Sequence, residues 1–349
     1  MDKVIDFLNK ITPKDDIVIV FNNDADGICS CVLMKKLLKE KNVKEPYIIY
    51  QPMPTDKNLI KKIQTTIPTK IIFLDLAVDQ QQNLIRKVSG ICDILIIDHH
   101  KITKDMNIKN IVHYNPRFDK PDIYQSASYL TYNICSKITD MSNSLWIAMI
   151  GIIADYNLDD STDLIKEFDK KNPGFIENIP DSLVAKIAQM IVAVRGTRAL
   201  TCDQIVRILE AARNPEDFYK SKDAEKLIES YKIIENEILS ITLDVEKNSE
   251  IIGDLILYRY KSKFGLRSEI ATRISERHPG KMVIVYEKMG DKIKLSSRNQ
   301  DKKYNVSKIL SKAAKGMKAS AGGHDVAAGA TVQVKDWEDF KNNLISLLE

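Results

Sequence analysis

Residues 17–27 read IVIVFNNDADG, and this stretch decides the fold class. Five apolar residues in a row, from Ile17 to Phe21, are typical of a strand that is buried on both faces. They end in Asn-Asn-Asp, and a helical pattern then runs from Gly27 to about Lys41. The stretch therefore predicts a strand followed by a helix, with polar side chains at the carboxyl end of the strand.

The same arrangement repeats along the first half of the chain. We expect further strands at residues 47–50, 70–74 and 94–97, separated by polar helical stretches at 57–66 and 79–90. Fully apolar strands that alternate with helices indicate a parallel sheet covered on both faces. Sheets of this α/β class bind their ligands at the carboxyl ends of the strands.

The pattern becomes helical from about residue 126 to residue 245, and a second α/β region begins close to residue 246. Strand-like runs and helical runs alternate there at residues 255–258, 266–277, 282–286, 293–297 and 304–315. A chain of 349 residues is long enough for two cores. We therefore predict three parts with a site in the cleft: an N-terminal parallel-sheet domain (1–200), a helical connector (201–245) and a smaller C-terminal α/β domain (246–349).

The composition excludes several classes of protein. Apolar residues make up 44% of the chain and charged residues 29%, as in an average globular protein, and no apolar run approaches the roughly 20 residues of a membrane span. The N-terminal residues MDKVIDFLNK carry acids where a signal peptide would have a basic start, so we expect a cytoplasmic protein without a membrane partner. The five cysteines form no C-x-x-C pair, so we expect buried thiols and no zinc site.

Acidic and basic residues are partly segregated along the chain. Residues 246–349 hold 20 Lys and Arg against 13 Asp and Glu, whereas residues 1–245 hold 32 against 35. A carboxylate-rich half that can hold cations and a basic half that can hold phosphates suit metal-dependent work on an anionic polymer. A solvated, lysine-rich surface explains the same counts equally well.

Acidic side chains and other potential metal ligands follow three of the predicted strands. They are Asn22, Asp24 and Asp26 after the first strand, Asp75 after the third, and Asp98, His99 and His100 after the fourth. Buried carboxylates this close together repel one another unless cations neutralise them, and Asp and His donors suit Mn²⁺ or a similar divalent ion. The number of ligands is enough for two ions.

Helix capping is the alternative explanation for Asp24 or Asp75 taken singly. Capping does not explain two adjacent histidines after Asp98, because the whole chain has only five histidines. Asp155 follows the apolar helical stretch 146–154 and is a further acid that we expect to face inward, although by itself it stays ambiguous.

These motifs together resemble the DHH phosphoesterase superfamily, which includes RecJ-type exonucleases, oligonucleotide and cyclic-dinucleotide phosphodiesterases, and family II pyrophosphatases. The residues that carry the resemblance to its motifs I to IV are Asp24-Ala25-Asp26-Gly27, Asp75, Asp98-His99-His100 and Asp155.

The resemblance implies a site with two metal ions. One ion would be held by Asp26, Asp75, His99 and Asp155, and the other by Asp24 with Asp75. It also implies catalytic roles for Asp98, His99 and His100, with His100 orienting ligands or the leaving group.

Two further positions belong to this comparison. Residues 125–128 (QSAS) resemble a small-residue loop near the site, which assigns Ser126 to substrate binding. Asn22 stands where the family usually has His or Asp. An amide oxygen can coordinate a cation but carries no charge, so we expect Asn22 to be a weak ligand and its ion to bind less tightly.

Residues 321–329 read AGGHDVAAG and are the sharpest feature of the C-terminal half. Two adjacent glycines let backbone N–H groups converge on an anion, although a tight turn is the simpler explanation. The preceding stretch is basic, at Arg298, Lys302, Lys303, Lys308, Lys312, Lys315 and Lys318.

This combination resembles the DHHA1 domain, whose Gly-Gly-His motif and preceding Ser-x-Arg strand grip substrate phosphate. The resemblance assigns substrate binding to Arg298, Gly322, Gly323 and His324. Arg195 and Arg198 are further candidates for phosphate contacts. We expect the nearby aromatic residues to be core residues, with stacking on a base as the alternative. They are Tyr258, Tyr260, Phe264 and Tyr304.

The resemblance therefore implies a compact, RecJ-like phosphodiesterase or exonuclease of the archaeal type. It would act on single-stranded DNA or RNA or on short oligonucleotides, in DNA repair or replication, with two Mn²⁺ ions that Mg²⁺ could replace. One alternative is a replication-associated scaffold with a weakened metal site and replication proteins such as GINS as partners. Another is a cyclic-dinucleotide phosphodiesterase.

Overall fold

The computed structural model describes residues 1–52, 58–323 and 325–348, and the chain divides into two units. The first unit ends at Tyr231 and the second begins at Lys232, inside the long helix α11 (Glu225–Asn248). Each unit has its own sheet and its own apolar core.

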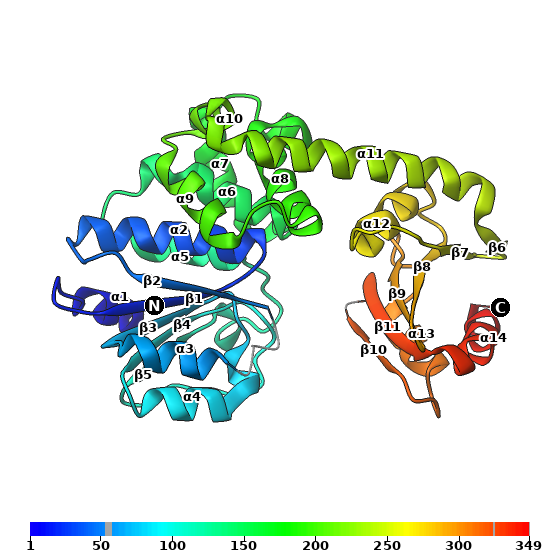
Figure 1. The fold of residues 1–349 in the computed structure, drawn as a ribbon, viewed down its shortest axis with the longest axis horizontal. Coiled ribbons are helices and arrows are strands. Elements are labelled where there is room, and N and C mark those ends of the chain that lie inside the picture. Colours follow the sequence, from blue (N-terminus) through cyan, green and yellow to red (C-terminus); the bar gives the residue numbers. More distant parts are fainter. Residues whose placement is uncertain (53–57, 324, 349) are drawn as a thin grey trace. The chain divides into compact units, whose positions relative to one another are not determined.

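The sheet of the first unit has five parallel strands in the order β2-β1-β3-β4-β5 (Figure 1). They are β1 (Ile17–Asn22), β2 (Tyr47–Gln51), β3 (Lys70–Leu74), β4 (Asp93–Ile97) and β5 (Ile111–Tyr114). Four of these strands confirm the sequence prediction, and β5 is an addition that its short, His-containing run did not reveal. Phe21 pairs with Leu74, and Leu74 with Ile97, so β1, β3 and β4 end at one edge of the sheet.

Helices fill most of the rest of the first unit. They are α1 (Asp2–Asn9), α2 (Ala25–Glu40), α3 (Leu59–Thr66), α4 (Gln82–Ser89), α5 (Ala127–Ser136), α6 (Leu145–Ala154), α7 (Thr162–Lys171), α8 (Leu183–Thr197), α9 (Cys202–Ala211) and α10 (Pro215–Lys220). Short 3-10 turns occur at η1 (Val78–Gln81), η2 (Pro116–Phe118), η3 (Ser142–Ser144), η4 (Asp159–Ser161), η5 (Ile176–Asp181) and η6 (Lys222–Ala224). The helical character expected after residue 126 is confirmed.

Both faces of this sheet are apolar because successive residues of each strand pack into different cores. Ile19 and Phe21 of β1 lie in the core that contains residues of α2, α5 and α6. Val18 and Val20 lie in the core that contains residues of α3 and α4. Figure 1 shows α2 and α5 on one side of the sheet and α3 and α4 on the other. This double burial is why each central strand reads as an unbroken apolar run.

The second unit has a mixed, six-stranded sheet in the order β10-β11-β9-β8-β7-β6. Its strands are β6 (Glu250–Ile252), β7 (Leu255–Arg259), β8 (Met282–Met289), β9 (Lys292–Arg298), β10 (Ser320–Gly323) and β11 (Ala327–Gln333). Only β7 and β8 pair in parallel among these described strands. The helices are α12 (Arg267–Arg277), α13 (Val306–Ala313) and α14 (Trp337–Leu348), with the turn η7 (Val334–Asp336) before α14.

Several expectations about side chains are also confirmed. All five cysteines are free and buried. Tyr258, Tyr260 and Phe264 are buried in the second unit, as expected of core residues. Among the described residues, no helix has both the length and the apolar character that crossing a membrane requires.

Candidate metal centre

The chain between β1 and α2 is a tight turn that Asp24 closes. Its Oδ1 accepts a hydrogen bond of 3.0 Å from the backbone N–H of Gly27, so Asp24 is the N-cap of α2. A Cβ on Gly27 would lie 2.3 Å from the backbone oxygen of Asn22, so a larger residue cannot fit here without moving the turn. Capping, the alternative explanation for Asp24, therefore holds for one of its two oxygens.

Asp26 lies in the first turn of α2 and is buried. Its two carboxylate oxygens accept backbone hydrogen bonds at the start of α5, from Ala127 (2.7 Å) and from Ser128 (2.9 Å). Ser126 is the N-cap of α5 and is fully buried, so in this structure its side chain caps the helix that holds Asp26. The loop at residues 125–128 thus holds the Asp26 carboxylate in place.

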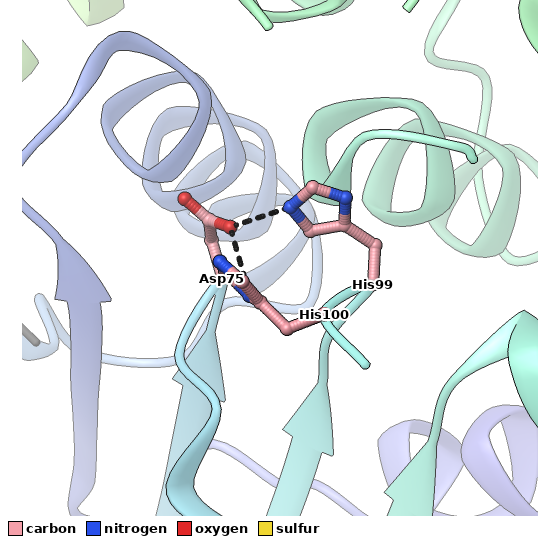
Figure 2. A group of neighbouring side chains, drawn as sticks. All are labelled: Asp75, His99 and His100. Atoms are coloured by element: carbon pink, nitrogen blue, oxygen red, sulfur yellow. Dashed lines mark hydrogen bonds and ion pairs between the residues drawn. The ribbon is translucent and has the colours of Figure 1, made fainter. Parts of the chain in front are cut away.

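Asp75 follows β3 and is buried, with a positive φ of 58° that few residues other than glycine adopt. Figure 2 shows its Oδ1 facing both histidines of the neighbouring strand end. The distance from Asp75 Oδ1 to His99 Nε2 is 3.1 Å, and to His100 Nδ1 it is 3.9 Å. The strained backbone at Asp75 thus accompanies a side chain turned toward the site, as is common at functional sites.

Asp98 is hydrogen-bonded to His100. Its Oδ1 is 2.7 Å from His100 Nδ1, and the side chain is buried. Although burial alone would lower the pKa of His100, the hydrogen bond and the negative charge of Asp98 raise it to about 9. Burial raises the pKa of Asp98, but the hydrogen bonds and positive charges of His100 and His99 together outweigh it, and the pKa of Asp98 is lowered overall. The two residues form an ion pair beside the cluster.

His99 connects two groups of potential metal ligands. Its Nε2 faces Asp75, and its Nδ1 lies 3.7 Å from Asp155 Oδ2. One group is Asp75, His99 and His100 and the other is Asp26, His99 and Asp155; within each group the ligand atoms lie within 4.8 Å of one another. Asp155 directly follows α6 and faces inward, as its apolar approach suggested. Asp24 belongs to neither group.

The chemistry of these groups fits a divalent cation. His99 Nδ1 and Asp155 Oδ2 are buried and have no hydrogen-bond partner, which is costly for polar atoms unless an ion or water satisfies them. Burial and the neighbouring carboxylates raise the pKa of Asp26 and Asp75, and raise that of Asp155 to about 7. Without a cation the cluster therefore retains protons, and a divalent ion would replace them.

Asn22 lies between Asp24 and Asp75 in an unexpected orientation. Its amide nitrogen donates to Asp24 Oδ2 and, at 3.2 Å, to Asp75 Oδ2. Its amide oxygen accepts a hydrogen bond of 2.9 Å from the backbone of Asn23. The side chain thus turns a hydrogen-bond donor, and not the expected oxygen ligand, toward the two carboxylates.

Sequence reasoning missed three residues that hold the site in place. Arg117 Nε donates to the backbone oxygen of His99 at 2.8 Å. The ring of Tyr124 lies 5.5 Å from that of His99, and its hydroxyl donates to the backbone oxygen of Asp155 at 3.2 Å. A Cβ on Gly151 would lie 2.2 Å from Ser128 Oγ, so this glycine lets α6 approach α5. In the sequence, the one sign of these residues was the Asn-Pro-Arg run at 115–117, directly after β5.

The second unit contains the other predicted site residues. Arg298 donates to Ser268 Oγ at 2.5 Å and to Thr272 Oγ1 at 3.1 Å, which ties the end of β9 to α12. Gly322 pairs with Gly329 across β10 and β11, and a shallow hollow of about 290 Å³ lies beside them, with Arg267 and Lys294 in its lining. Gly323 has a φ of 141°. His324 lies outside the described residues.

Arg195, another candidate phosphate contact, belongs to the first unit. Its guanidinium donates to the side-chain oxygen of Asn23 at 3.4 Å, beside the turn that carries Asp24. Arg198 is exposed at the C-cap of α8, with a φ of 57°.

A parallel sheet with this cluster at its strand ends, followed by a smaller mixed-sheet unit, defines a two-domain α/β protein with a candidate divalent-metal centre. The chain matches the family model of the DHH family N-terminal domain over residues 16–157 and that of the DHHA1 domain over residues 257–349. It belongs to the DHH/DHHA1 superfamily, which confirms the resemblance of its motifs. No curated protein matches the chain.

Solved structures share this fold at low sequence identity. RecJ of Thermus thermophilus in complex with Mn²⁺ has a TM-score of 0.74 and 15% identity, and the match covers 99% of this chain and 54% of RecJ. CDC45 of Entamoeba histolytica has a TM-score of 0.58 and 12% identity, covering 99% and 98%. The pGpG-specific phosphodiesterase PggH of Vibrio cholerae has a TM-score of 0.55 and 14% identity, covering 95% and 98%. The chain thus spans about half the length of that RecJ.

Proposed function

We propose that this chain is a Mn²⁺-dependent phosphodiesterase that hydrolyses single-stranded DNA or RNA or short oligonucleotides. The observation that carries the proposal is His99, whose two ring nitrogens face Asp75 and Asp155 in two adjoining groups of metal ligands. Membership of the DHH/DHHA1 superfamily and the likeness of fold to RecJ and PggH support the same class of reaction.

The residues of the cluster have distinct roles in this proposal. Asp26, His99 and Asp155 would hold one ion. Asp75 and Asp24, which both accept hydrogen bonds from Asn22, would hold a second. Bound divalent ions supply a hydroxide at neutral pH and offset the charge that develops on the phosphate. Ala127 and Ser128 hold and orient the Asp26 carboxylate through their backbone N–H groups.

His100 would act on the phosphate directly. Asp98 holds its Nδ1 and keeps the imidazole protonated near neutral pH, and 39% of the His100 side chain is exposed. A protonated imidazole at the exposed side of the cluster can donate to a phosphate oxygen or to the leaving group. Asp98 is then a positioning residue for His100.

The second unit would bind the substrate beyond the reacting phosphate. Its surplus of basic residues supports this proposal, as does the hollow beside Gly322 that Arg267 and Lys294 line. We assign Arg298, Gly322, Gly323 and His324 to phosphate binding there. The domain boundaries at residues 200 and 245 and a cytoplasmic location stay predictions.

One observation favours a second candidate function. Asn22 donates to Asp24 and Asp75, so these carboxylates have a neutral partner that could take the place of a second cation. A replication-associated scaffold with a weakened metal site would have this feature, and the fold is similar to that of CDC45. Replication proteins such as GINS would then be the partners.

Hydrolysis assays with defined substrates separate these functions. Purified protein would be incubated with end-labelled single-stranded DNA, RNA, a linear dinucleotide and a cyclic dinucleotide, each with Mn²⁺, with Mg²⁺ and with excess chelator. We expect Mn²⁺-dependent cleavage of single strands. Asp75→Asn is the variant to compare with the parent. Asn tolerates the positive φ at this position but cannot bind a cation with the same strength. Cleavage that persists in chelator, or no cleavage of any substrate, would contradict the proposal.

A further inference from the structure

Tyr156, the residue directly after Asp155, is unusually exposed for an aromatic side chain. At 83% exposure it has the highest value among the exposed large apolar side chains of the described residues. Consecutive Cα atoms are about 3.8 Å apart, so the backbone of Tyr156 directly adjoins that of a proposed metal ligand. Burial does not explain why an aromatic residue occupies this position.

The backbone at Tyr156 is also strained. Tyr156 lies two residues after the end of α6 and has a φ of 52°, in the left-handed region that glycine favours at helix ends. Its N–H bonds to Ile153 O at 3.1 Å, and the N–H of Asn157 bonds to Ile152 O at 2.9 Å, which is the usual hydrogen-bond pattern of such a helix end. Glycine would satisfy this pattern at a lower conformational cost.

The residues on both sides of Tyr156 are held firmly. The hydroxyl of Tyr124 donates to the backbone oxygen of Asp155 at 3.2 Å. The side-chain oxygen of the buried Asn157 accepts from the Ser126 backbone at 3.1 Å and from the Ser161 hydroxyl at 2.5 Å. The backbone at Tyr156 is therefore fixed at both ends, so its Cα and Cβ stand in a defined place next to the metal centre.

Strain alone does not mark a functional residue, because Ile67 has the same two properties. It ends α3 with a φ of 47° and is 77% exposed. Ile67 precedes β3, however, and so lies at the amino end of the strands, whereas Tyr156 adjoins Asp155 at the carboxyl end. The difference is location, and Ile67 provides a matched control.

We propose that the ring of Tyr156 is a stacking surface for a nucleobase of the substrate, next to the scissile phosphate. An exposed aromatic ring on a rigid backbone stacks on any base, because every base has a π-face. This inference rests on the proposed function and narrows it: the preferred substrate is a phosphodiester that carries a base, in contrast to a base-free pyrophosphate or polyphosphate.

The test compares four substitutions and a set of abasic substrates. Tyr156→Gly removes the ring and relieves the strain, Tyr156→Trp retains a ring, and Ile67→Gly relieves the same strain away from the site. Tyr156→Asn is a second ring-free variant that tolerates a positive φ. Binding of a fluorescent single strand would be measured by anisotropy with Ca²⁺ in place of Mn²⁺. An abasic residue would be placed at each position of that strand in turn.

We expect Tyr156→Gly and Tyr156→Asn to bind the intact strand about 5- to 150-fold more weakly, the range measured for loss of one stacked base. Tyr156→Trp and Ile67→Gly should bind like the parent, and neither glycine variant should melt below it. At one position of the strand, the abasic residue should weaken binding to the parent by the same factor. At that position it should not weaken binding to Tyr156→Gly any further. When the strand binds to Tyr156→Trp, the emission of the introduced indole should be quenched.

The outcomes distinguish the two proposals. The stacking inference is wrong if Tyr156→Gly binds the intact strand like the parent, or if the substitution weakens binding by the same factor at every abasic position. Hydrolysis by the parent would still support the phosphodiesterase. If the parent binds single strands and shows the abasic coupling at Tyr156 but cleaves nothing with Mn²⁺, the stacking inference stands and the phosphodiesterase does not. A parent that binds no single strand would contradict the stacking inference.

Discussion

His99 Nδ1 and Asp155 Oδ2 face each other across 3.7 Å in the interior of the first unit, and neither atom has a hydrogen-bond partner. The two residues come from different parts of the fold, since His99 follows β4 and Asp155 follows α6. Leaving both atoms unsatisfied is costly, and a shared cation removes the cost. The predictions below test how this arrangement depends on metal, on packing and on charge.

The first prediction concerns pH and metal. Burial and the charge of Asp26 raise the pKa of Asp155 to about 7, from about 4 in an unfolded chain. The folded, metal-free protein therefore retains a proton that the unfolded chain loses, and this contribution to stability disappears as the pH rises from about 4 to 7. We expect the melting temperature in chelator to fall over this range, and the increase produced by Mn²⁺ to grow.

Asp155→Asn is the control for this prediction, because an amide does not titrate. Its melting temperature in chelator should depend less on pH than that of the parent, and Mn²⁺ should raise it less. Scanning fluorimetry of both proteins between pH 4 and 8, with and without Mn²⁺, measures the effect. Identical pH dependence in the two proteins would show that Asp155 does not carry the shifted proton.

The second prediction concerns packing between α5 and α6. A Cβ at position 151 would lie 2.2 Å from Ser128 Oγ and 2.8 Å from Asp26 Oδ1. We expect Gly151→Ala to lower the free energy of unfolding by about 1–3 kcal/mol and to raise the Mn²⁺ concentration needed for half-maximal rate, because Asp26 must move. Gly90→Ala is the control, since its Cβ would meet only Lys87 O at 3.6 Å.

A rescue variant strengthens this test. Adding Ser128→Ala to Gly151→Ala removes the nearest clashing atom and should restore part of the stability and of the metal affinity. Urea denaturation and a Mn²⁺ titration of hydrolysis measure the two properties. A Gly151→Ala protein that behaves like Gly90→Ala would mean that the two helices adjust without disturbing Asp26.

The third prediction concerns Asn22, which donates to two carboxylates. Asn22→Asp replaces this donor with a charge beside Asp24 and Asp75, so the metal-free protein should melt lower while Mn²⁺ binds more tightly. We expect Asn22→Asp and Asn22→His to lower the Mn²⁺ concentration for half-maximal rate, and Asn22→Ala to lower it less, because Ala removes the donor that competes with the ion but adds no ligand. A metal titration of the four proteins checks this, and coincident curves would show that Asn22 does not affect the ions.

The fourth prediction separates substrate binding from chemistry. If Arg298 contacts phosphate, Arg298→Ala should weaken binding of single strands and reduce its dependence on salt, with the metal content unchanged. Arg298 also donates to Ser268 and Thr272, so the double variant Ser268→Ala, Thr272→Ala is the control that removes these bonds and keeps the charge. Equal salt dependence in the parent and Arg298→Ala would contradict a phosphate contact.

The central strands and their acidic ends were predictable from the sequence alone. The run Ile17 to Phe21 is apolar because both faces of β1 are buried, and this property is local to the run. Parallel strands end at one edge, so the sequence also predicted that the acids after β1, β3 and β4 would gather there. The observed sheet and the match to the DHH family N-terminal domain confirm the predicted fold.

The role of each acid was decided by tertiary contacts. Asp26 is held by the backbone of Ala127 and Ser128, about a hundred positions further along the chain, whereas Asp98 pairs with His100. The sequence determined which side chains reach the strand ends, because burial and hydrogen bonding within each strand and turn are local. Only the tertiary structure determined which of them share a ligand group, because those distances depend on how separate helices pack against one sheet.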